Sequence, residues 1–439
     1  MSAQKHNLKI SIVAELGTSV YSVQPIIDNI TRQGGRVVLY TTSDNIEKSK
    51  IYLSSNNIDF IAINEQNSKW FGVFDYFLKK LLTKETFSSQ YARIVPSDNK
   101  ILNILYKIAK WLPKPSQKKI NSIYSKFWSR VNSKPYFPTK NVLVVSRCNN
   151  TIKLNNKHHN FFTIVESWDH PVKSPFYYKS KITYSWNKEL STDMEKFQNN
   201  SKKYTEIFPL KFRYLDQVDS LSPQASNKLK CEIDFIANNS YVLYICSTSG
   251  YSKGGLFDFE LKLIQKVLKA CKKEGKLLYI KPHPHYNESD FANLENSKLI
   301  RVGIGATNNG NNYIFTDDDQ FYKIQLLKNA ERIINAATTL VLEASILNEN
   351  IYQLKINSDN FGSFAKGCEN YHIKNYLNSY SDIIDLTSGD IQEKLNKIIQ
   401  EPQKTNLYSK NLKEWLSQKA LNDSISEIIN DISNENVSY

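Results

Sequence analysis

A histidine held between two prolines follows one of the apolar runs of the sequence. The run 277–281 (LLYIK) leads directly into Pro282, His283, Pro284 and His285. Prolines restrict the backbone on both sides, so the His283 side chain is held in place, and an imidazole N–H there can donate to a phosphate. Two of the seven histidines lie in this one turn. This concentration favours an anion-binding role for the turn and its Lys281 over incidental surface histidines.

Hydroxyl side chains open a second candidate anion site. The run 332–337 (RIINAA) ends in small residues, and Thr338 and Thr339 then begin a helical stretch that contains Glu343. Free backbone N–H groups at a helix start, together with the helix dipole, attract an anion. Glu343 can reach a ribose hydroxyl, or it can be a capping-box partner. A third turn, after the run 241–246, offers three hydroxyl groups, those of Ser247, Thr248 and Ser249.

A carboxylate and an imidazole lie together in the turn that ends the run 160–166. Ser167, Trp168, Asp169 and His170 follow one another there. Asp169 or His170 can act as a general base toward a hydroxyl group, with Trp168 as an aromatic platform. The alternative is a structural turn in which Trp168 is buried. Two residues after the first apolar run can line the same side, Gly17 and Thr18.

Three consecutive aspartates, 317–319, invite a metal-binding interpretation, because Mg²⁺ prefers carboxylate oxygens. They also directly precede a helical stretch that starts near Gln320, where acidic residues complement the helix dipole. We favour the helix start, so the sequence predicts no metal and no cofactor.

Apolar, β-branched runs alternate with helical stretches along the first half of the chain. The helical stretch that follows the first run ends in Gly34 and Gly35. Runs of this length are typical of buried parallel strands. The strand-like runs are 8–16, 36–42, 60–64, 141–146 and 160–167. We therefore expect an N-terminal Rossmann-like domain over 1–215, with a basic helical insertion at about 99–140.

The second half repeats this alternation. A polar connector is expected over 216–236 and a second Rossmann-like domain over 237–388, followed by helices without a strand over 389–439. The helical stretch before the run 277–281 is expected to end at Gly275. Its strand-like runs are 241–250, 277–285, 332–337 and 351–356. The sequence thus predicts an α/β protein with two doubly wound domains facing a central cleft, where ligands meet the carboxyl ends of strands.

The positive charge is concentrated in one stretch. The chain has a net charge of +14, and residues 99–165 carry 13 Lys and Arg and no Asp or Glu. Apolar residues recur at helical spacing within 100–134, beside Lys, Trp and Tyr. Such a basic amphipathic pair of helices can lie on an anionic membrane surface. An ordinary half-buried hairpin is the alternative, and nucleic acid is a less favoured partner.

Composition excludes several classes of protein. Hydrophobic residues make up 41% of the chain and Gly and Pro are few, so it is neither disordered throughout nor collagen-like. The five scattered cysteines form no CxxC pair, which argues against a disulfide framework or a zinc ribbon.

No apolar run is long enough to span a membrane, and the opening run lacks a cleavage site. We expect a cytoplasmic protein that binds peripherally to the inner face of the bacterial inner membrane.

These motifs together resemble the GT-B glycosyltransferases of the CDP-glycerol glycerophosphotransferase and surface-polysaccharide group. The resemblance is strongest over 160–356. Bacterial polysialyltransferases and Kdo transferases are similar in using an HP motif and a hydroxyl pair on a CMP-sugar donor. Two positions depart from the pattern, with Thr-Thr in place of Ser-Thr and His170 in place of Asn. The matching segments are Ser167-Trp168-Asp169, Ser185-Trp186-Asn187, His283-Pro284, Thr338-Thr339 and Glu343-Ala344.

The resemblance implies a metal-independent glycosyltransferase that moves a sugar from a nucleotide-activated donor to a hydroxyl of a surface polysaccharide or lipid-linked acceptor. It implies that His283 and the threonine pair contact the donor phosphates, while Asp169 or His170 activates the acceptor. Three alternatives stay open: a nucleotide-sugar epimerase, a glycerol- or ribitol-phosphate transferase that uses a CDP-polyol, and a basic scaffold for membrane or nucleic acid. The expected donor-binding residues are Ser247, Thr248, Ser249, Lys281, His283, Pro284, His285, Thr338, Thr339 and Glu343.

Overall fold

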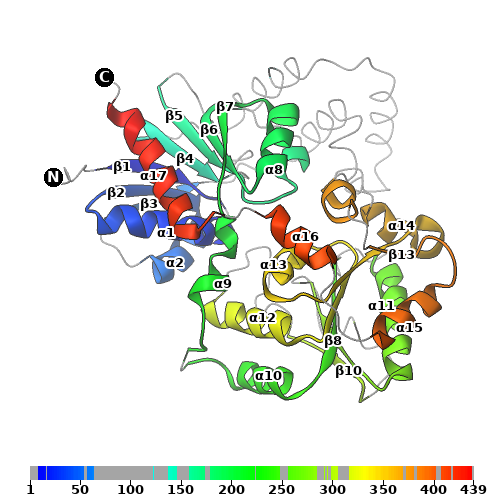
Figure 1. Cartoon of the computed structure of the whole chain (residues 1–439). Helices are drawn as coiled ribbons and strands as arrows, with labels where there is room; N and C mark the ends of the chain where they lie inside the picture. Colours follow the sequence, from blue (N-terminus) through cyan, green and yellow to red (C-terminus); the bar gives the residue numbers. More distant parts are fainter. Residues whose placement is uncertain are drawn as a thin grey trace, which may run out of the picture. The chain divides into compact units, whose positions relative to one another are not determined.

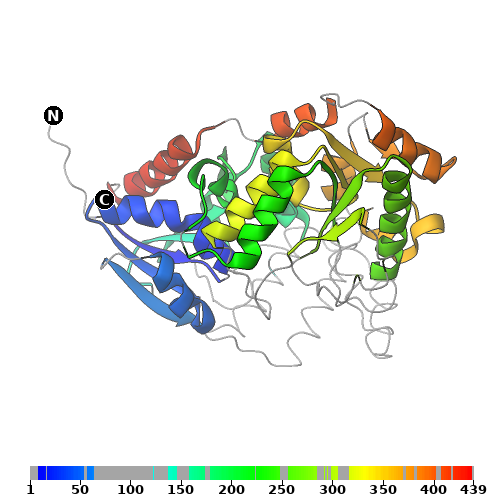
Figure 2. The same ribbon diagram turned by 90° about the horizontal axis from the view of Figure 1, so that it is seen from below.

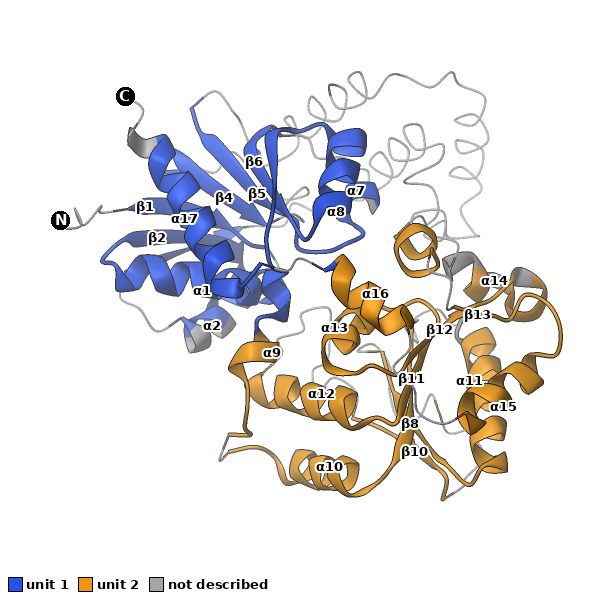
Figure 3. Ribbon diagram, in the orientation of Figure 1, with its two compact units in different colours: residues 1–213, 416–439 blue, residues 214–415 orange. Residues whose placement is uncertain are grey.

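The computed structural model forms two compact units, residues 1–213 with 416–439 (unit 1) and residues 214–415 (unit 2), shown in Figure 3. Within the chain the structure describes residues 8–15, 17–53, 57–63, 122, 137–145, 158–173, 178–222, 224–247, 256–283, 291, 294, 298–304, 316–368, 372–379, 383–401, 407–416 and 419–437.

Unit 1 is built on a parallel sheet with the strand order β3-β2-β1-β4-β5-β6-β7. The inner strands are almost wholly apolar and buried, as strands covered by helices on both faces must be. The strand order reverses between β1 and β4, which makes the sheet doubly wound. The strands are β1 (Lys9–Val13), β2 (Arg36–Thr42), β3 (Ile58–Ile63), β4 (Asn141–Val145), β5 (Asn160–Ile164), β6 (Ser180–Ser185) and β7 (Ser201–Glu206).

The helix α1 of unit 1 ends where the glycines predict. Gly34 has φ +81°, a backbone conformation that disfavours side chains, and the Gly35 N–H donates to Ile30 O at 2.9 Å to close the last turn. The helices of unit 1 are α1 (Gly17–Arg32), α2 (Ser43–Tyr52), α7 (His170–Lys173), α8 (Lys188–Asp193) and α17 (Leu421–Val437), with helical turns at Met194–Gln198 and Leu210–Phe212.

The last helix, α17, belongs to unit 1 and not to a separate C-terminal segment. It packs on α1 and β4 and is drawn in red in Figure 1. The Asn141 side chain donates to Ile432 O at 2.7 Å, and Tyr184 Oη donates to Asp431 at 3.1 Å. Its apolar stripe joins the core of unit 1 and consists of Leu421, Ile425, Ile428, Ile429 and Ile432.

Unit 2 repeats the doubly wound arrangement, with the parallel strand order β10-β9-β8-β11-β12-β13. Here the order reverses between β8 and β11. Ile245 of β8 is in register with Lys281 of β9 and with Asn335 of β11, so the three strands end together. The strands are β8 (Tyr241–Ile245), β9 (Leu277–Lys281), β10 (Ile300–Val302), β11 (Arg332–Asn335), β12 (Ile351–Lys355) and β13 (Ile384–Asp385).

Helices cover both faces of this second sheet. Helices α10 and α12 pack side by side on one face, as Figure 2 shows, while α11 packs with α14 and α15 on the other. Gly275, at φ +64°, ends α11 as predicted. The helices are α9 (Tyr214–Gln217), α10 (Asn227–Asn238), α11 (Leu256–Lys273), α12 (Asp317–Asn329), α13 (Leu340–Leu347), α14 (Ser358–Cys368), α15 (Ile391–Gln400) and α16 (Leu407–Trp415), with a helical turn at Ile373–Leu377.

The structure differs from the sequence-based expectation at the edges of the elements. The expected connector 216–236 contains most of α10, which starts at a Ser226 cap that accepts from Leu229 N. The edge strands β7, β10 and β13 were not expected, because they are short or polar and lack the apolar signal of an inner strand. The basic stretch 99–140 lies outside the described residues apart from Ser122 and 137–140. A cleft between the two domains stays a prediction.

Candidate functional site

The switch point of the unit 2 sheet is the place where ligands of open α/β folds bind, just beyond the carboxyl ends of the strands. Ser247 follows β8 and Ala337 follows β11, and the two are joined there by a hydrogen bond from Ala337 N to Ser247 Oγ of 3.1 Å. Ser247 N in turn donates to Glu260 Oε1 at 2.7 Å, and Glu260 is fully buried in α11. The hydroxyl turn after β8 and the segment that leads into α13 are therefore held together.

The start of α13 is shaped by side chains as well as by the backbone. Thr338 N donates to Asn335 Oδ1 at 3.2 Å, and Leu340 N donates to Thr338 Oγ1 at 3.4 Å. Asn335 itself is fixed by Gln353 of β12. Thr339 makes no side-chain cap, and both threonines are partly exposed. Backbone N–H groups and a threonine hydroxyl therefore meet at the positive end of a helix dipole.

The HP turn is joined to the same strand end. Cys246 N donates to Lys281 O at 3.0 Å, and the His283 backbone N–H donates to the Cys246 thiol. Burial raises the pKa of Cys246 well above its usual value, so this cysteine is a neutral packing residue. The His283 side chain is partly exposed. The turns after β9, β8 and β11 thus lie next to one another, with His283 on one side of Ser247 and Thr338 on the other.

Glu343, one turn inside α13, is not the capping-box partner considered from the sequence. Its Oε2 forms an ion pair of 2.7 Å with Lys323 of α12 and also accepts from Tyr214 Oη. The Lys323 ammonium lies 4.0 Å from the centroid of the Tyr214 ring. Burial lowers the pKa of Lys323, while the Glu343 carboxylate opposes this shift. Oε1 of Glu343 receives no hydrogen bond from the described residues, so it remains available to a hydroxyl donor.

The carboxylate and imidazole of the first-domain turn are buried. Asp169 and His170 are 6% and 3% exposed, and Asp169 Oδ1 lies 3.9 Å from His170 Nε2. Trp168 is also buried, as the structural-turn alternative expects and not as an open aromatic platform, whereas Ser167 is partly exposed. The turn is compact because Ser167 O accepts from His170 N at 3.0 Å. The two titratable groups are therefore adjacent, as a base and its orienting partner need to be.

The first helix of unit 1 meets this turn through one hydrogen bond. Ser19 Oγ, in the first turn of α1, donates to Glu166 Oε2 at 2.7 Å, in a contact that is fully buried. Gly17 and Thr18 begin α1 and are partly exposed. The predicted acceptor-side segments after β1 and β5 are thus neighbours within unit 1.

The three aspartates start α12, as the sequence predicts. Thr316 caps the helix, and Asp319 and Thr316 form a reciprocal capping box. Asp318 accepts from Ser222 N and Ser222 Oγ at 2.7 and 2.8 Å. Among the described residues, no cluster of three or more His, Cys, Asp or Glu side chains can hold a metal ion.

Four of the expected donor-binding residues lie outside the described part of the chain: Thr248, Ser249, Pro284 and His285. Sequence reasoning also missed three side chains near the site, Tyr214, Glu260 and Lys323. Each acts through a partner on another element of the fold, so no local pattern could have identified it.

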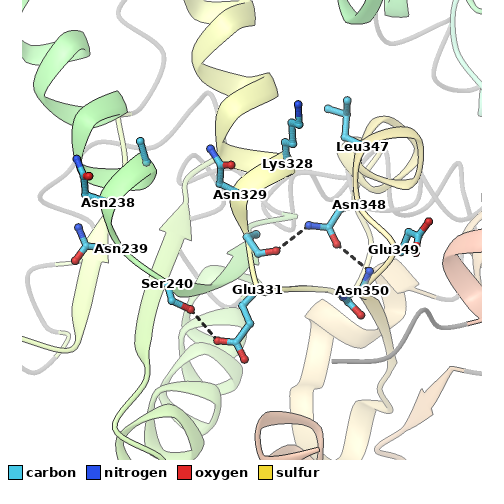
Figure 4. Close-up of a pocket in the computed structure, with 12 residues that line it drawn as sticks. Asn238, Asn239, Ser240, Lys328, Asn329, Glu331, Leu347, Asn348, Glu349 and Asn350 are labelled. Carbon is cyan, nitrogen blue, oxygen red and sulfur yellow. Dashed lines mark hydrogen bonds between the residues drawn. The ribbon is translucent and has the colours of Figure 1, made fainter. Parts of the chain in front are cut away.

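A pocket of about 590 Å³ lies at the opposite edge of the unit 2 sheet, before β8, β11 and β12 (Figure 4). Asparagine is the commonest residue type in its lining, and the side chains of Asn239 and Asn348 donate to carbonyls at helix ends. Asn348 donates to Leu327 O and Ala330 O, and Asn239 donates to Phe235 O. These contacts stabilise the ends of α12 and α10, which gives the asparagines a structural role.

Comparison with known proteins shows the fold class of the chain. No family model and no curated protein sequence matches it. Among solved structures, the UDP-GlcNAc 2-epimerase of Methanocaldococcus jannaschii is similar, with a TM-score of 0.51 and 12% identity over 97% of this chain and 100% of that one. UGT89C1 of Arabidopsis thaliana, complexed with UDP-L-rhamnose, has a TM-score of 0.50 and 10% identity over 98% and 100% of the two chains. At these identities the likeness shows the fold, and the predicted GT-B class of two Rossmann-like domains is confirmed.

Proposed function

We propose that the protein is a glycosyltransferase that takes a sugar from a nucleotide-activated donor. The observation that carries this proposal is the hydrogen bond between Ser247 and Ala337 at the switch point of unit 2. It holds the turn after β8 against the start of α13, and the His283 backbone is bound to the same turn. A helix N-terminus, hydroxyl groups and an imidazole then surround one position suited to a phosphate.

These groups account for the binding of the donor and for the departure of its nucleotide. The Thr338 hydroxyl, which accepts from Leu340 N and keeps its own proton to donate, binds a phosphate oxygen at the positive end of the α13 dipole. His283 stabilises the negative charge that develops on the departing phosphate. The open Oε1 of Glu343 accepts from a ribose hydroxyl, while Lys323 and Tyr214 hold Oε2. These roles call for no metal ion.

The acceptor half is assigned to unit 1. Asp169 removes the proton of an acceptor hydroxyl, with His170 as its neighbour, and Ser167, Gly17 and Thr18 line the acceptor side. The acceptor is a surface polysaccharide or a lipid-linked glycan.

The expected place of action is the inner face of a bacterial membrane, reached through the basic stretch 100–134. No helix in the described part of the chain is long and apolar enough to cross a membrane.

A nucleotide panel tests the proposal. We expect one of CMP, CDP, UDP, GDP and dTDP to raise the melting temperature of the full chain clearly more than the others, because a ligand that binds only the folded state stabilises it. The matching nucleotide-sugar is then expected to release nucleotide faster when an acceptor glycan is added. Stabilisation by none of the five would contradict the proposal.

Product analysis of the same reaction separates the two enzymatic alternatives. A nucleotide-sugar epimerase would change the sugar or release nucleotide at a rate that no acceptor alters. A CDP-polyol transferase would form a phosphodiester and release CMP. The scaffold alternative predicts that vesicles or nucleic acid bind and that any nucleotide binding does not depend on His283.

A further inference from the structure

Lys281, like Lys323, lies in unit 2 at the proposed donor site, but it has no carboxylate partner among the described residues. Lys281 is the last residue of β9 and precedes the Pro282-His283 turn directly. Its Nζ donates to Ile304 O at 2.9 Å and lies 5.1 Å from the centroid of the Tyr322 ring. Among the described residues, no Asp or Glu oxygen is within 4 Å of this ammonium group.

The neighbouring charges are already engaged. Lys323 is paired with Glu343, and Glu232 is held by two hydrogen bonds from Arg301. Asp319 is used in the capping box of α12. Burial, followed by repulsion from Lys323, lowers the pKa of Lys281 to about 8, although Asp319, Cys246 and Glu232 oppose this shift.

A desolvated ammonium with one carbonyl acceptor is costly, because a buried charge is normally paired. It still has two N–H donors to offer, and it lies at the same strand ends as His283 and Ser247. An anion that arrives with a ligand would supply the partner that the described residues do not provide.

We propose that the Lys281 ammonium binds a phosphate oxygen of the nucleotide donor directly, an inference that rests on the proposed function. An anion beside Lys281 favours its charged form, so nucleotide binding near pH 8 draws a proton from solution. Since the pKa is about 8, about half a proton is expected per bound nucleotide at that pH.

Calorimetric titration of the full chain with the nucleotide from the panel, at pH 8 in Tris and in HEPES, measures this proton uptake from the difference in heat. We compare wild type with Lys281→Met, Lys281→Arg and the control Lys410→Met, whose lysine is exposed on α16. Lys281→Met is expected to bind about 10- to 100-fold more weakly, since a charged hydrogen bond is lost. It is also expected to melt no lower than wild type, because an unpaired desolvated charge is replaced by an apolar group.

Lys281→Arg is expected to bind without proton uptake, because a guanidinium stays charged. Lys410→Met is expected to match wild type in both affinity and uptake. A nucleoside without phosphate is expected to cause no uptake. Unchanged affinity and uptake in Lys281→Met, or equal uptake with the nucleoside, would overturn the proposal.

Inorganic phosphate and pyrophosphate are titrated into the full chain in a separate experiment. If they bind with proton uptake that depends on Lys281 while no nucleotide binds, the proposed nucleotide function is wrong, but the phosphate site at Lys281 is supported. If a nucleotide binds with the same affinity and the same proton uptake in wild type and in Lys281→Met, the proposed function is supported and the inference about Lys281 is wrong.

Discussion

Replacement of His283 by alanine is expected to lower the rate of sugar transfer about 100- to 1,000-fold, mainly in kcat. The imidazole donates to the phosphate that leaves with the nucleotide, and removal of one such donor from a preorganised site has an effect of this size. Steady-state kinetics with the matching nucleotide-sugar, measured as nucleotide released, gives kcat and KM separately.

His158→Ala is the matched control for this variant, since His158 is exposed in unit 1 and has no assigned role. It is expected to keep full activity. A His283→Ala enzyme with wild-type kcat would remove the imidazole from the mechanism. Unchanged nucleotide binding in His283→Ala, combined with weaker vesicle binding in Lys118→Glu/Lys119→Glu, would favour the scaffold alternative.

Asp169→Asn is expected to slow acceptor-dependent transfer about 100- to 10,000-fold, the usual effect of removing a general base. The amide has the same shape as the carboxylate but cannot accept the proton. Nucleotide binding is expected to stay as in wild type, because Asp169 belongs to unit 1 and the donor groups belong to unit 2. Transfer rates with a saturating acceptor, together with calorimetric binding of the nucleotide, measure the two quantities.

The burial of Asp169 makes a structural role the competing explanation. Asp44→Asn, an exposed substitution at the start of α2, serves as the control and is expected to change neither the melting temperature nor the transfer rate. If Asp169→Asn lowers the melting temperature while the folded fraction keeps its rate, the turn around Trp168 is structural and the base lies elsewhere.

Local sequence signals predicted the inner strands of both units except β6 (Ser180–Ser185). Buried strands are recognised from their β-branched runs. Gly34 and Gly275 mark the ends of their helices because a left-handed backbone conformation favours glycine. The prediction that Asp317–Asp319 start a helix rests on equally local physics.

Long-range packing explains what sequence reasoning missed. The edge strand β7 is polar and partly exposed, so its pattern looks like a loop. Helix α17 returns to unit 1 because its isoleucines complete that core, a fact about the fold and not about the helix. In the same way, Glu343 shows a ribose-binding or capping pattern, but its ion pair with Lys323 depends on how α12 packs on α13.

The proposed function depends on one position, the phosphate site at the switch point of unit 2. A crystal structure of the full chain with the nucleotide that stabilises it most is the direct test. We expect a phosphate within hydrogen-bond distance of the His283 imidazole and of the Thr338 hydroxyl at the start of α13. A nucleotide phosphate bound anywhere else, such as in unit 1 or in the asparagine-lined pocket, would contradict it.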